Sequence, residues 1–224
     1  VYIYYARVSV GNNTELDFKL ISEKCGLFSK TDVEVAISKI DTLKNEYSEK
    51  ELINIYNYML SNAQDPDIIM YLIRCLDVYR DPSSLEVLVD VLLLKNGTNQ
   101  NEMLKEKFVN VRVMCAKAIA NQKNTDVVSS LLYCLNNKNE HYKVRLACAD
   151  ALGRIGDRFA VAPLIDVVKD ENEKSVYLRE SAVSALGLLG DSRAVDPIVS
   201  ILETKQGIMD KFTFLKERAI EALI

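Results

Sequence analysis

The stretch VRLACADALGRIGDRFAVAPLIDVV begins at Val144, and a second version of it, LRESAVSALGLLGDSRAVDPIVSIL, begins at Leu178. The two versions match at a constant offset of 34 positions, and the matches use four of the chain's eight glycines and two of its four prolines. Such self-similarity at a fixed period predicts stacked structural repeats. The clearest matched pairs are Arg145/Arg179, Ala151/Ala185, Leu152/Leu186, Gly153/Gly187, Gly156/Gly190, Asp157/Asp191, Ala160/Ala194, Val161/Val195 and Pro163/Pro197.

Weaker copies extend the repeat in both directions. VRVMCAKAIANQKNTDVVSSLLYCL starts at Val111, and LKERAIEALI starts at Leu215. A segment from Ile68 keeps the apolar positions without the glycines, and VEVAISKIDTL from Val33 is fainter still. The spacing therefore predicts about five or six copies, clearest over residues 111–224.

Each copy reads as two helices. Val144, Cys148, Leu152 and Ile155 recur at helical spacing and form one apolar face. The second apolar face falls on Val161, Leu164, Ile165 and Val168, after Gly156 as a helix stop and Asp157 as the next N-cap. Pro163 and Pro197 predict a second helix that starts late or kinks.

Small residues on the first helix of each copy favour close packing between neighbouring copies. Ala147, Ala149 and Ala151 recur in kind as Ala182 and Ala185. One helix pair cannot bury its apolar stripe alone, but stacked pairs share a continuous core. We expect an all-α fold, an α-solenoid (superhelix) of stacked antiparallel helix pairs.

This pattern resembles the HEAT-like repeats of the phycobilisome-lyase type. The resemblance is strong over Lys143–Ile201, fair over Val111–Leu135 and Lys211–Ile224, and thin before Asp65. It implies outer helices such as AVAPLIDVV and inner helices such as VRLACADALGRIG, the inner ones lining a concave surface. We expect an N-terminal capping or flanking segment over 1–30 and the repeat solenoid over 31–224, truncated at both ends.

Composition narrows the function classes. The 224 residues carry a net charge of −4, one histidine (His141) and no tryptophan. An acidic chain disfavours nucleic acid as partner, and one histidine gives little basis for a metal centre or a histidine-based catalytic site. The five cysteines, an odd number, predict reduced and buried thiols and hence a cytoplasmic protein. The apolar start, Val1–Val10, is either a cap or the remnant of a membrane or signal segment, so membrane contact would come only through flanking sequence.

Two columns of charge recur with the repeat. A basic residue stands at Arg112, Arg145, Arg179 and Lys216, where it is either an anion-binding ladder or a structural tie between repeats. We favour the tie, with Asp170 and Asn137 at the positions of its acidic or carbonyl partners. Asp81, Asp157 and Asp191 stand at helix starts, so we read them as N-caps and not as a metal or acid–base cluster.

The positions of the inner helices that point away from the core form the candidate partner-binding face. Between copies these positions vary while the apolar framework repeats, which suits a specific protein or peptide partner. The alternative is that its apolar members pack against neighbouring inner helices. The candidates are Met70, Tyr71, Arg74, Val113, Met114, Lys117, Asn121, Asp150, Arg154, Glu180, Ser184, Leu188, Glu217 and Glu221, with Val78, Leu146, Ala147, Ser181 and Arg218 beside them.

Three spacers between helix pairs are secondary candidates. They are Leu94–Phe108, Asn136–Lys143 and Thr204–Phe212, which read either as contact loops or as tolerated polar insertions. We interpret His141, in the second spacer, as a solvated side chain.

Three function classes compete. A non-catalytic scaffold or adaptor that binds a protein or peptide is favoured, because no catalytic constellation and no cofactor or metal site is evident. The resemblance also permits a bilin lyase-like or chaperone-like subunit acting on another protein. A nucleic-acid role like that of the alkylpurine DNA glycosylases is disfavoured, because it would need a basic concave face with aromatic residues, and this chain is acidic and lacks tryptophan. Iron-dependent HEAT-type hydroxylases are excluded, because one histidine cannot supply the paired His-Glu ligands.

Overall fold

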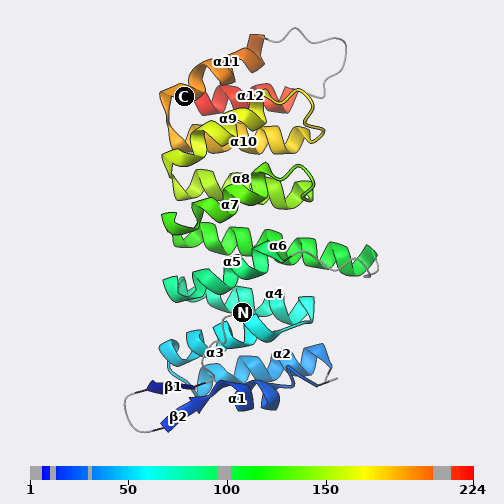
Figure 1. Cartoon of the computed structure of the whole chain (residues 1–224), viewed down its shortest axis with the longest axis vertical. Coiled ribbons are helices and arrows are strands. Elements are labelled where there is room, and N and C mark those ends of the chain that lie inside the picture. Colours follow the sequence, from blue (N-terminus) through cyan, green and yellow to red (C-terminus); the bar gives the residue numbers. More distant parts are fainter. Residues whose placement is uncertain (1–6, 11–13, 30–31, 95–101, 204–212) are drawn as a thin grey trace. The chain divides into compact units, whose positions relative to one another are not determined.

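The computed structural model describes residues 7–10, 14–29, 32–94, 102–203 and 213–224. Over these ranges it holds twelve α-helices, short 3-10 turns and a two-stranded antiparallel hairpin (Figure 1). The helices pack in successive neighbours, so the expected all-α repeat fold is confirmed. The main elements are β1 (Arg7–Val10), β2 (Thr14–Asp17), α1 (Phe18–Cys25), α2 (Val33–Thr42), α3 (Glu49–Asn62), α4 (Pro66–Tyr79), α5 (Leu85–Leu93), α6 (Glu102–Gln122), α7 (Val128–Asn136), α8 (Tyr142–Ile155), α9 (Val161–Lys169), α10 (Val176–Leu189), α11 (Val195–Glu203) and α12 (Thr213–Leu223).

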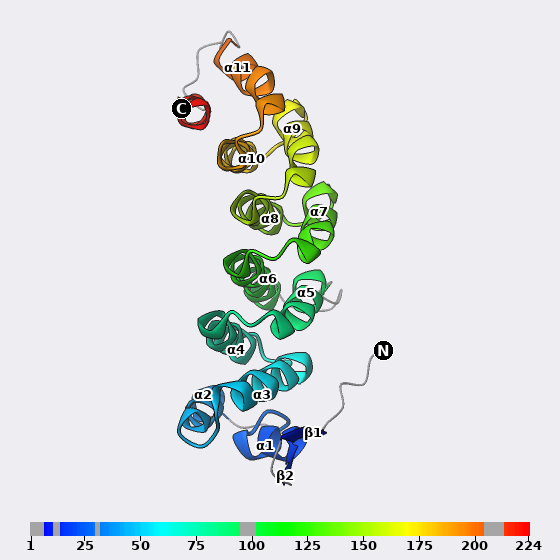
Figure 2. The same cartoon turned by 90° about the vertical axis from the view of Figure 1, so that its left-hand side faces the viewer.

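The chain divides into two compact units, Val1–Met114 and Cys115–Ile224, and the boundary falls inside α6. In the second unit α8, α10 and α12 lie on one side, and α7, α9 and α11 lie on the other (Figure 2). Helix α10 packs against α8, α9 and α12. We call α8, α10, α12 and the C-terminal part of α6 the inner helices of this unit.

The core of the second unit follows the repeated apolar pattern. Val144, Cys148 and Leu152 are fully buried, whereas Ile155 at the end of the same face is half-buried. On α9 the buried face includes Val167, and Ile165 is half-buried, so the face predicted for this helix was slightly displaced. The alanines predicted to permit close packing are buried on both α8 and α10, as expected.

The junction between the paired helices recurs with the same backbone geometry. Gly156 ends α8 in the left-handed region at φ 85°, and Asp157 then caps the next turn by accepting from the Phe159 amide at 2.9 Å. Asp191 does the same after Gly190, which confirms the stop and cap roles. Earlier copies replace the glycine by Arg80 or Lys123, also at positive φ, and keep a cap at Asp81 or Asn124.

The outer helices start late, as the prolines predicted. A 3-10 turn over Arg158–Ala160 precedes α9, which begins at Val161. Pro163 therefore lies in the first turn of α9, where a backbone N–H has no intrahelical acceptor to lose. Pro197 occupies the same place in α11, after the turn Ser192–Ala194.

The N-terminal part of the first unit departs from the uniform helical expectation. Strands β1 and β2 pair in antiparallel register, with Arg7 opposite Asp17. The strand sequence RVSV alternates β-branched and polar residues, which suits a strand better than a helix. Helix α1 follows directly, capped by Asp17 through the Leu20 amide, and it packs against α2 and α3.

The spacer predicted over Leu94–Phe108 is shorter than expected, because residues 102–108 belong to α6. Its sequence EMLKEKF consists largely of good helix formers, and Lys105 pairs with Glu102 at 2.6 Å one turn away. Residues 95–101 of this spacer and the spacer Thr204–Phe212 lie outside the described residues. All five cysteines are buried and none of them forms a disulfide, as predicted.

Candidate functional site

At Arg112, Arg145 and Arg179 the repeated basic residue is a structural tie. The Nε atom of each arginine donates to a backbone carbonyl in the last turn of the preceding outer helix. These carbonyls have no intrahelical donor, so the guanidinium satisfies them and places positive charge at the negative end of the helix dipole. The donor–acceptor pairs are Arg112–Leu92 at 2.6 Å, Arg145–Leu135 at 2.9 Å and Arg179–Val168 at 3.2 Å.

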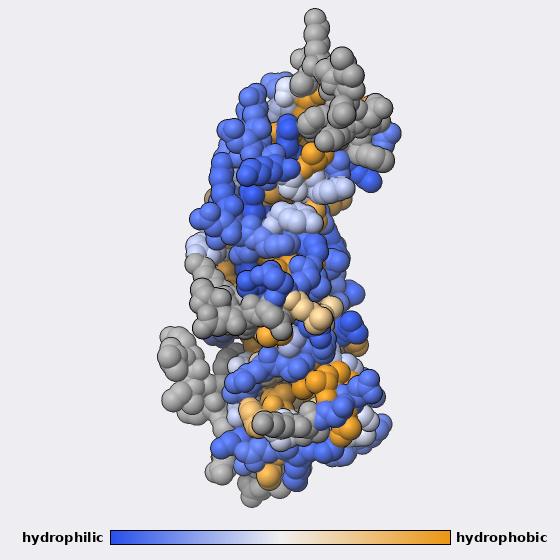
Figure 3. Space-filling view, turned by 90° about the vertical axis from the view of Figure 1, so that its right-hand side faces the viewer, coloured by the Kyte–Doolittle hydropathy of each residue, from blue (hydrophilic) through white to orange (hydrophobic). Residues whose placement is uncertain are grey.

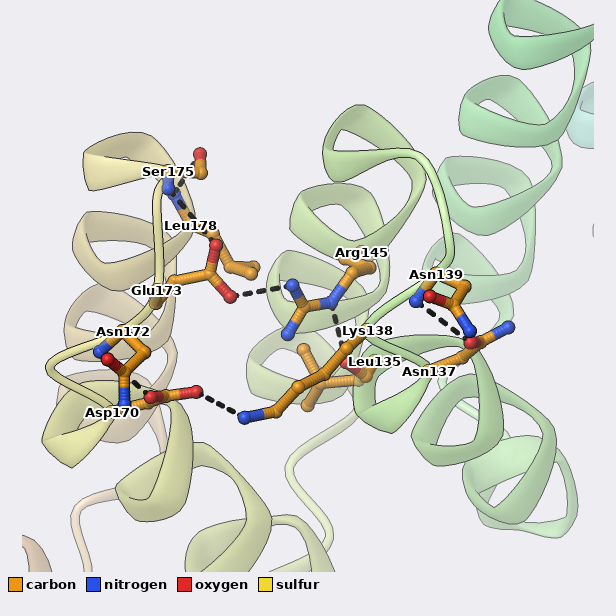
Figure 4. A network of polar contacts seen from close by, with 10 residues as sticks. All are labelled: Leu135, Asn137, Lys138, Asn139, Arg145, Asp170, Asn172, Glu173, Ser175 and Leu178. Carbon is orange, nitrogen blue, oxygen red and sulfur yellow. Dashed lines mark hydrogen bonds and ion pairs between the residues drawn. The ribbon is translucent and has the colours of Figure 1, made fainter.

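Arg145 lies in a network of polar contacts that joins two loops of the second unit (Figure 4). Its Nη1 atom lies 2.6 Å from Glu173 Oε2, and both side chains are buried. Glu173 Oε1 also accepts from the Ser175 amide at 3.0 Å, and Ser175 Oγ caps α10 through the Leu178 amide. One guanidinium therefore connects the end of α7 and the start of α8 to the loop before α10.

The partners predicted for this column were wrong in one respect. Asp170 does not hydrogen-bond to Arg145: its Oδ1 accepts from the Asn172 amide at 3.0 Å, and its Oδ2 lies 2.7 Å from Lys138 Nζ. Asn137 likewise turns its Oδ1 to the Asn139 amide. These shorter side chains satisfy their own loop backbone, whereas the longer Glu173 reaches the buried guanidinium. The Lys138 ammonium and, to a lesser extent, the Asn172 amide lower the pKa of Asp170 below its usual value.

A pocket of about 870 Å³ opens beside this network. It lies between the loops before α8 and α10 and the first turns of those two helices, on the side of the second unit that Figure 3 faces. That face is predominantly hydrophilic. Among the pocket's walls are Tyr142, 42% exposed, and Tyr177, 66% exposed. We call this the loop-edge pocket; it is lined by Lys138, Glu140, Tyr142, Arg145, Asp170, Asn172, Glu173, Lys174, Ser175, Val176, Tyr177 and Glu180.

Sequence reasoning did not find this pocket. The spacer Asn136–Lys143 was a candidate contact loop, but its neighbour Asp170–Ser175 was not singled out. The signal that was present is a tyrosine in the first turn of each following helix. His141 is also not simply solvated: its Nδ1 accepts from the Lys143 amide at 3.2 Å and caps α8, and its ring stacks on Tyr142.

The inner-helix face of the second unit presents most of the predicted side chains to solvent. Leu188 is 66% exposed, although it is a large apolar residue. Arg154 donates from Nη2 to Asn121 Oδ1 across neighbouring inner helices. None of the predicted site residues of this unit is fully buried. Those exposed are Lys117, Asp150, Arg154, Leu188, Glu217, Arg218 and Glu221, and those half-buried are Asn121, Leu146, Glu180 and Ser184.

Two neighbours of the predicted set do not face solvent. Ala147 is 2% exposed and Ser181 is 8% exposed, so placing them on the outward face was wrong. Ser181 Oγ hydrogen-bonds to the Leu146 carbonyl at 3.2 Å and to Asp150 Oδ1. Helix α8 covers Ser181, and the solvent-facing stripe is one residue narrower on α8 and on α10 than predicted.

In the first unit, several of the predicted site residues are half-buried, and one of them already makes a side-chain hydrogen bond. Arg74 and Val78 on α4 are exposed, and Val78 reaches 76%. Tyr71 is half-buried; its hydroxyl donates to Asp41 Oδ1, and Lys44 Nζ lies 5.9 Å from its ring centroid. Burial and the bond to Asp41 raise the pKa of Tyr71 well above its ordinary value. The remaining candidates, Met70, Val113 and Met114, are half-buried.

Glu180 belongs to both surfaces of the second unit. It lines the loop-edge pocket and also lies on the predicted stripe of α10, together with Ser184 and Leu188. Burial raises the pKa of Glu180, and the Arg218 charge opposes this effect. The pocket and the inner-helix face are therefore continuous at this carboxylate.

The described residues contain no group of three or more His, Cys, Asp or Glu side chains placed to hold a metal ion. The capping aspartates Asp81, Asp157 and Asp191 each accept from the backbone of their own turn, as caps do. No helix within the described ranges combines the length and apolarity needed to cross a membrane.

Family comparison agrees with this geometry. The family model for HEAT repeats matches residues 100–177, and the model for the PBS lyase HEAT-like repeat matches residues 178–204. The chain is a HEAT-like repeat protein. A search of curated proteins found no match to it.

HEAT repeats generally mediate protein–protein interaction, which supports a protein partner in general terms. In this HEAT-like repeat protein the matched ranges include the arginine ties, the loop-edge pocket and the predicted stripes of α8 and α10. The family match therefore covers the part of the chain in which the candidate surfaces are best defined.

Proposed function

We propose that this HEAT-like repeat protein is a non-catalytic scaffold or adaptor that binds a partner protein or peptide on its inner-helix face. The observation that carries the proposal is the exposure of side chains on this face that the repeat framework does not need. Leu188 and Arg154 are exposed and Asn121 is half-buried; the three occupy the same place in successive copies and differ completely in chemistry, whereas the buried positions around them repeat. A surface that varies over a constant framework is suited to one particular partner.

The inner-helix face changes character along the second unit. Positive charge prevails on α6 and α8, where Lys117 and Arg154 outnumber Asp150. Negative charge prevails on α10 and α12, where Glu180, Glu217 and Glu221 outnumber Arg218. An extended partner with the opposite order of charges would gain both orientation and faster association. Leu188 supplies an apolar anchor within this charged surface.

The experiment is a comparison of two double variants as bait with native lysate. Arg154→Glu with Leu188→Asp changes the inner-helix face, and Asp166→Arg with Lys169→Glu changes exposed residues on the outer helix α9. Circular dichroism first establishes that both variants keep the helix content and melting temperature of the unaltered chain. We expect a partner retained by the outer variant and lost by the inner variant. A partner lost only with the outer variant would refute this assignment.

A bilin lyase-like or chaperone-like subunit is the second candidate, favoured by the match to the PBS lyase HEAT-like repeat over residues 178–204. It predicts that a bilin added to the purified chain gains a new visible absorption band. The scaffold proposal predicts an unchanged spectrum, so one titration separates the two.

A further inference from the structure

The loop-edge pocket has an unequal balance of charge. Four carboxylates and three cations line it, and two of the cations are bound by two of the carboxylates. Arg145 is held by Glu173 at 2.6 Å, and Lys138 is held by Asp170 at 2.7 Å. Both pairs lie in the wall of the pocket, and within each pair the two charges neutralise each other.

The carboxylate best placed to receive a ligand is Glu180. Glu140 turns its Oε1 to the His141 amide at 2.8 Å, at the start of α8. Glu180, by contrast, accepts no hydrogen bond from any of the described residues, and Arg218, the cation that acts on its charge, pairs with Glu221 at 2.5 Å. A half-buried carboxylate without a hydrogen-bond donor is stabilised when a cation arrives to supply one.

The aromatic walls fit the same ligand. Tyr142 and Tyr177 stand in the first turns of α8 and α10, and both keep a large part of their surface in solvent. The face of a tyrosine ring attracts a lysine ammonium or an arginine guanidinium within about 6 Å. Outside the two ion pairs, the pocket lining carries two carboxylates, Glu140 and Glu180, and one cation, Lys174. A phosphate or carboxylate ligand would be repelled by this excess of negative charge, so an anion is disfavoured.

We propose that the loop-edge pocket receives a lysine or arginine side chain of the partner segment. The inference rests on the proposed function and specifies the chemistry of the partner. The basic side chain enters between Tyr142 and Tyr177 and meets the Glu180 carboxylate. The rest of the segment continues from Glu180 along the stripe of α10 toward Leu188. The buried Arg145–Glu173 pair holds both loops in place and makes the pocket a preformed receptor.

The test uses a phage-displayed library of random 12-residue peptides selected on the purified chain. Each selected peptide is synthesised in two forms, with its basic residue intact and with arginine replaced by citrulline or lysine by acetyl-lysine. Binding is measured by fluorescence anisotropy to the unaltered chain and to Glu180→Gln, Tyr177→Ala and Leu188→Asp. Glu171→Gln is the matched control, because this exposed glutamate lies in the loop before α10 but does not line the pocket.

We expect the selected peptides to share a basic position. Glu180→Gln should weaken binding by about 10-fold and Tyr177→Ala by about 5-fold, and Glu171→Gln should leave it unchanged. The neutral form of the peptide should bind weakly to the unaltered chain and lose nothing further on Glu180→Gln.

Two other results overturn the inference and differ in what they leave standing. Peptides that are sensitive to Leu188→Asp, but not to Glu180→Gln, would refute the basic side chain and keep the inner-helix face. A library that yields no binder, or only binders insensitive to all three substitutions, would refute the pocket as a receptor for a basic segment, whereas the proposed function is decided separately by the lysate comparison above.

Discussion

A Cβ atom on Gly153 would lie 2.6 Å from the Cα atom of Ala185, so helix α8 can approach α10 this closely only because position 153 lacks a side chain. The next pair repeats the arrangement: a Cβ on Gly187 would lie 2.8 Å from Ala222 Cα on α12. The glycine of one inner helix therefore contacts an alanine of the following inner helix. Because the nearest atom belongs to the backbone in both cases, rotation of a side chain cannot relieve the contact.

Gly153→Ala should destabilise the chain although alanine is the better helix former. Helix propensity favours alanine by about 1 kcal/mol, whereas overpacking costs about 1–3 kcal/mol and here involves backbone. We expect a net loss of about 1–2 kcal/mol, measured as a lower urea midpoint by circular dichroism. The double variant with Ala185→Gly should recover only part of the loss, because Ala185 Cα remains the nearest atom. Ser184→Ala, on the solvent side of α10, should not destabilise the chain; a similar loss there would contradict this account.

Arg145→Met should lower the free energy of unfolding by more than the position of Arg145 near the surface loops suggests. The substitution leaves the Glu173 carboxylate buried without its cation and the Leu135 carbonyl without its donor. Loss of one partner of a buried pair costs about 3–5 kcal/mol. We expect a loss of that order in urea unfolding, and Arg145→Lys should not restore the wild-type value, because lysine cannot bind both acceptors in the same plane.

The control for this prediction is an exposed ion pair in the same unit. Arg193 and Asp191 pair at 2.8 Å, but the Arg193 side chain is 57% exposed. Arg193→Met should therefore lower the urea midpoint far less than Arg145→Met does. If Arg145→Met and Arg193→Met had equal effects, the Arg145 network would have no special structural role.

The lowered pKa values of the capping aspartates Asp191 and Asp81 indicate that the fold loses stability in acid. The Arg193 side chain and amide hold the pKa of Asp191 well below its usual range, and Ser83 lowers that of Asp81 in the same way. A lowered folded-state pKa stabilises the fold above the unfolded pKa of about 4, and this contribution is lost as the pH falls through the folded value. We expect the melting temperature to fall progressively below about pH 4. Asp191→Asn should be less stable at pH 7 yet lose less on acidification; an unchanged acid slope would contradict the assignment.

The repeat made the fold predictable because it encodes backbone geometry. Gly156 and Gly190 mark the helix stops, the following aspartates mark the caps, and the prolines mark the late start of the outer helices. Each of these residues acts within a few positions of itself along the chain, so its role can be derived from neighbouring sequence alone.

The candidate site was less predictable because it depends on side-chain reach and on contacts between copies. Whether Asp170 or Glu173 would bind Arg145 depends on one methylene of side-chain length and on the path of the loop. Ser181 appeared to be outward on a helical wheel, but the neighbouring helix covers it, since α8 and α10 approach so closely at Gly153. The loop-edge pocket arises from two spacers that are separate in sequence and adjacent only after stacking.

The five buried cysteines should be unreactive in the folded chain. Burial raises the pKa of both Cys25 and Cys75, which reduces the fraction of thiolate, and the thiolate is the form that iodoacetamide attacks. We expect intact mass spectrometry at pH 8 to show mainly unmodified protein after a time in which the urea-unfolded chain gains all five adducts. The residual rate should rise with urea below the unfolding midpoint, because modification then requires local opening. Rapid modification of two or more thiols without urea would show that the helices around them do not remain packed.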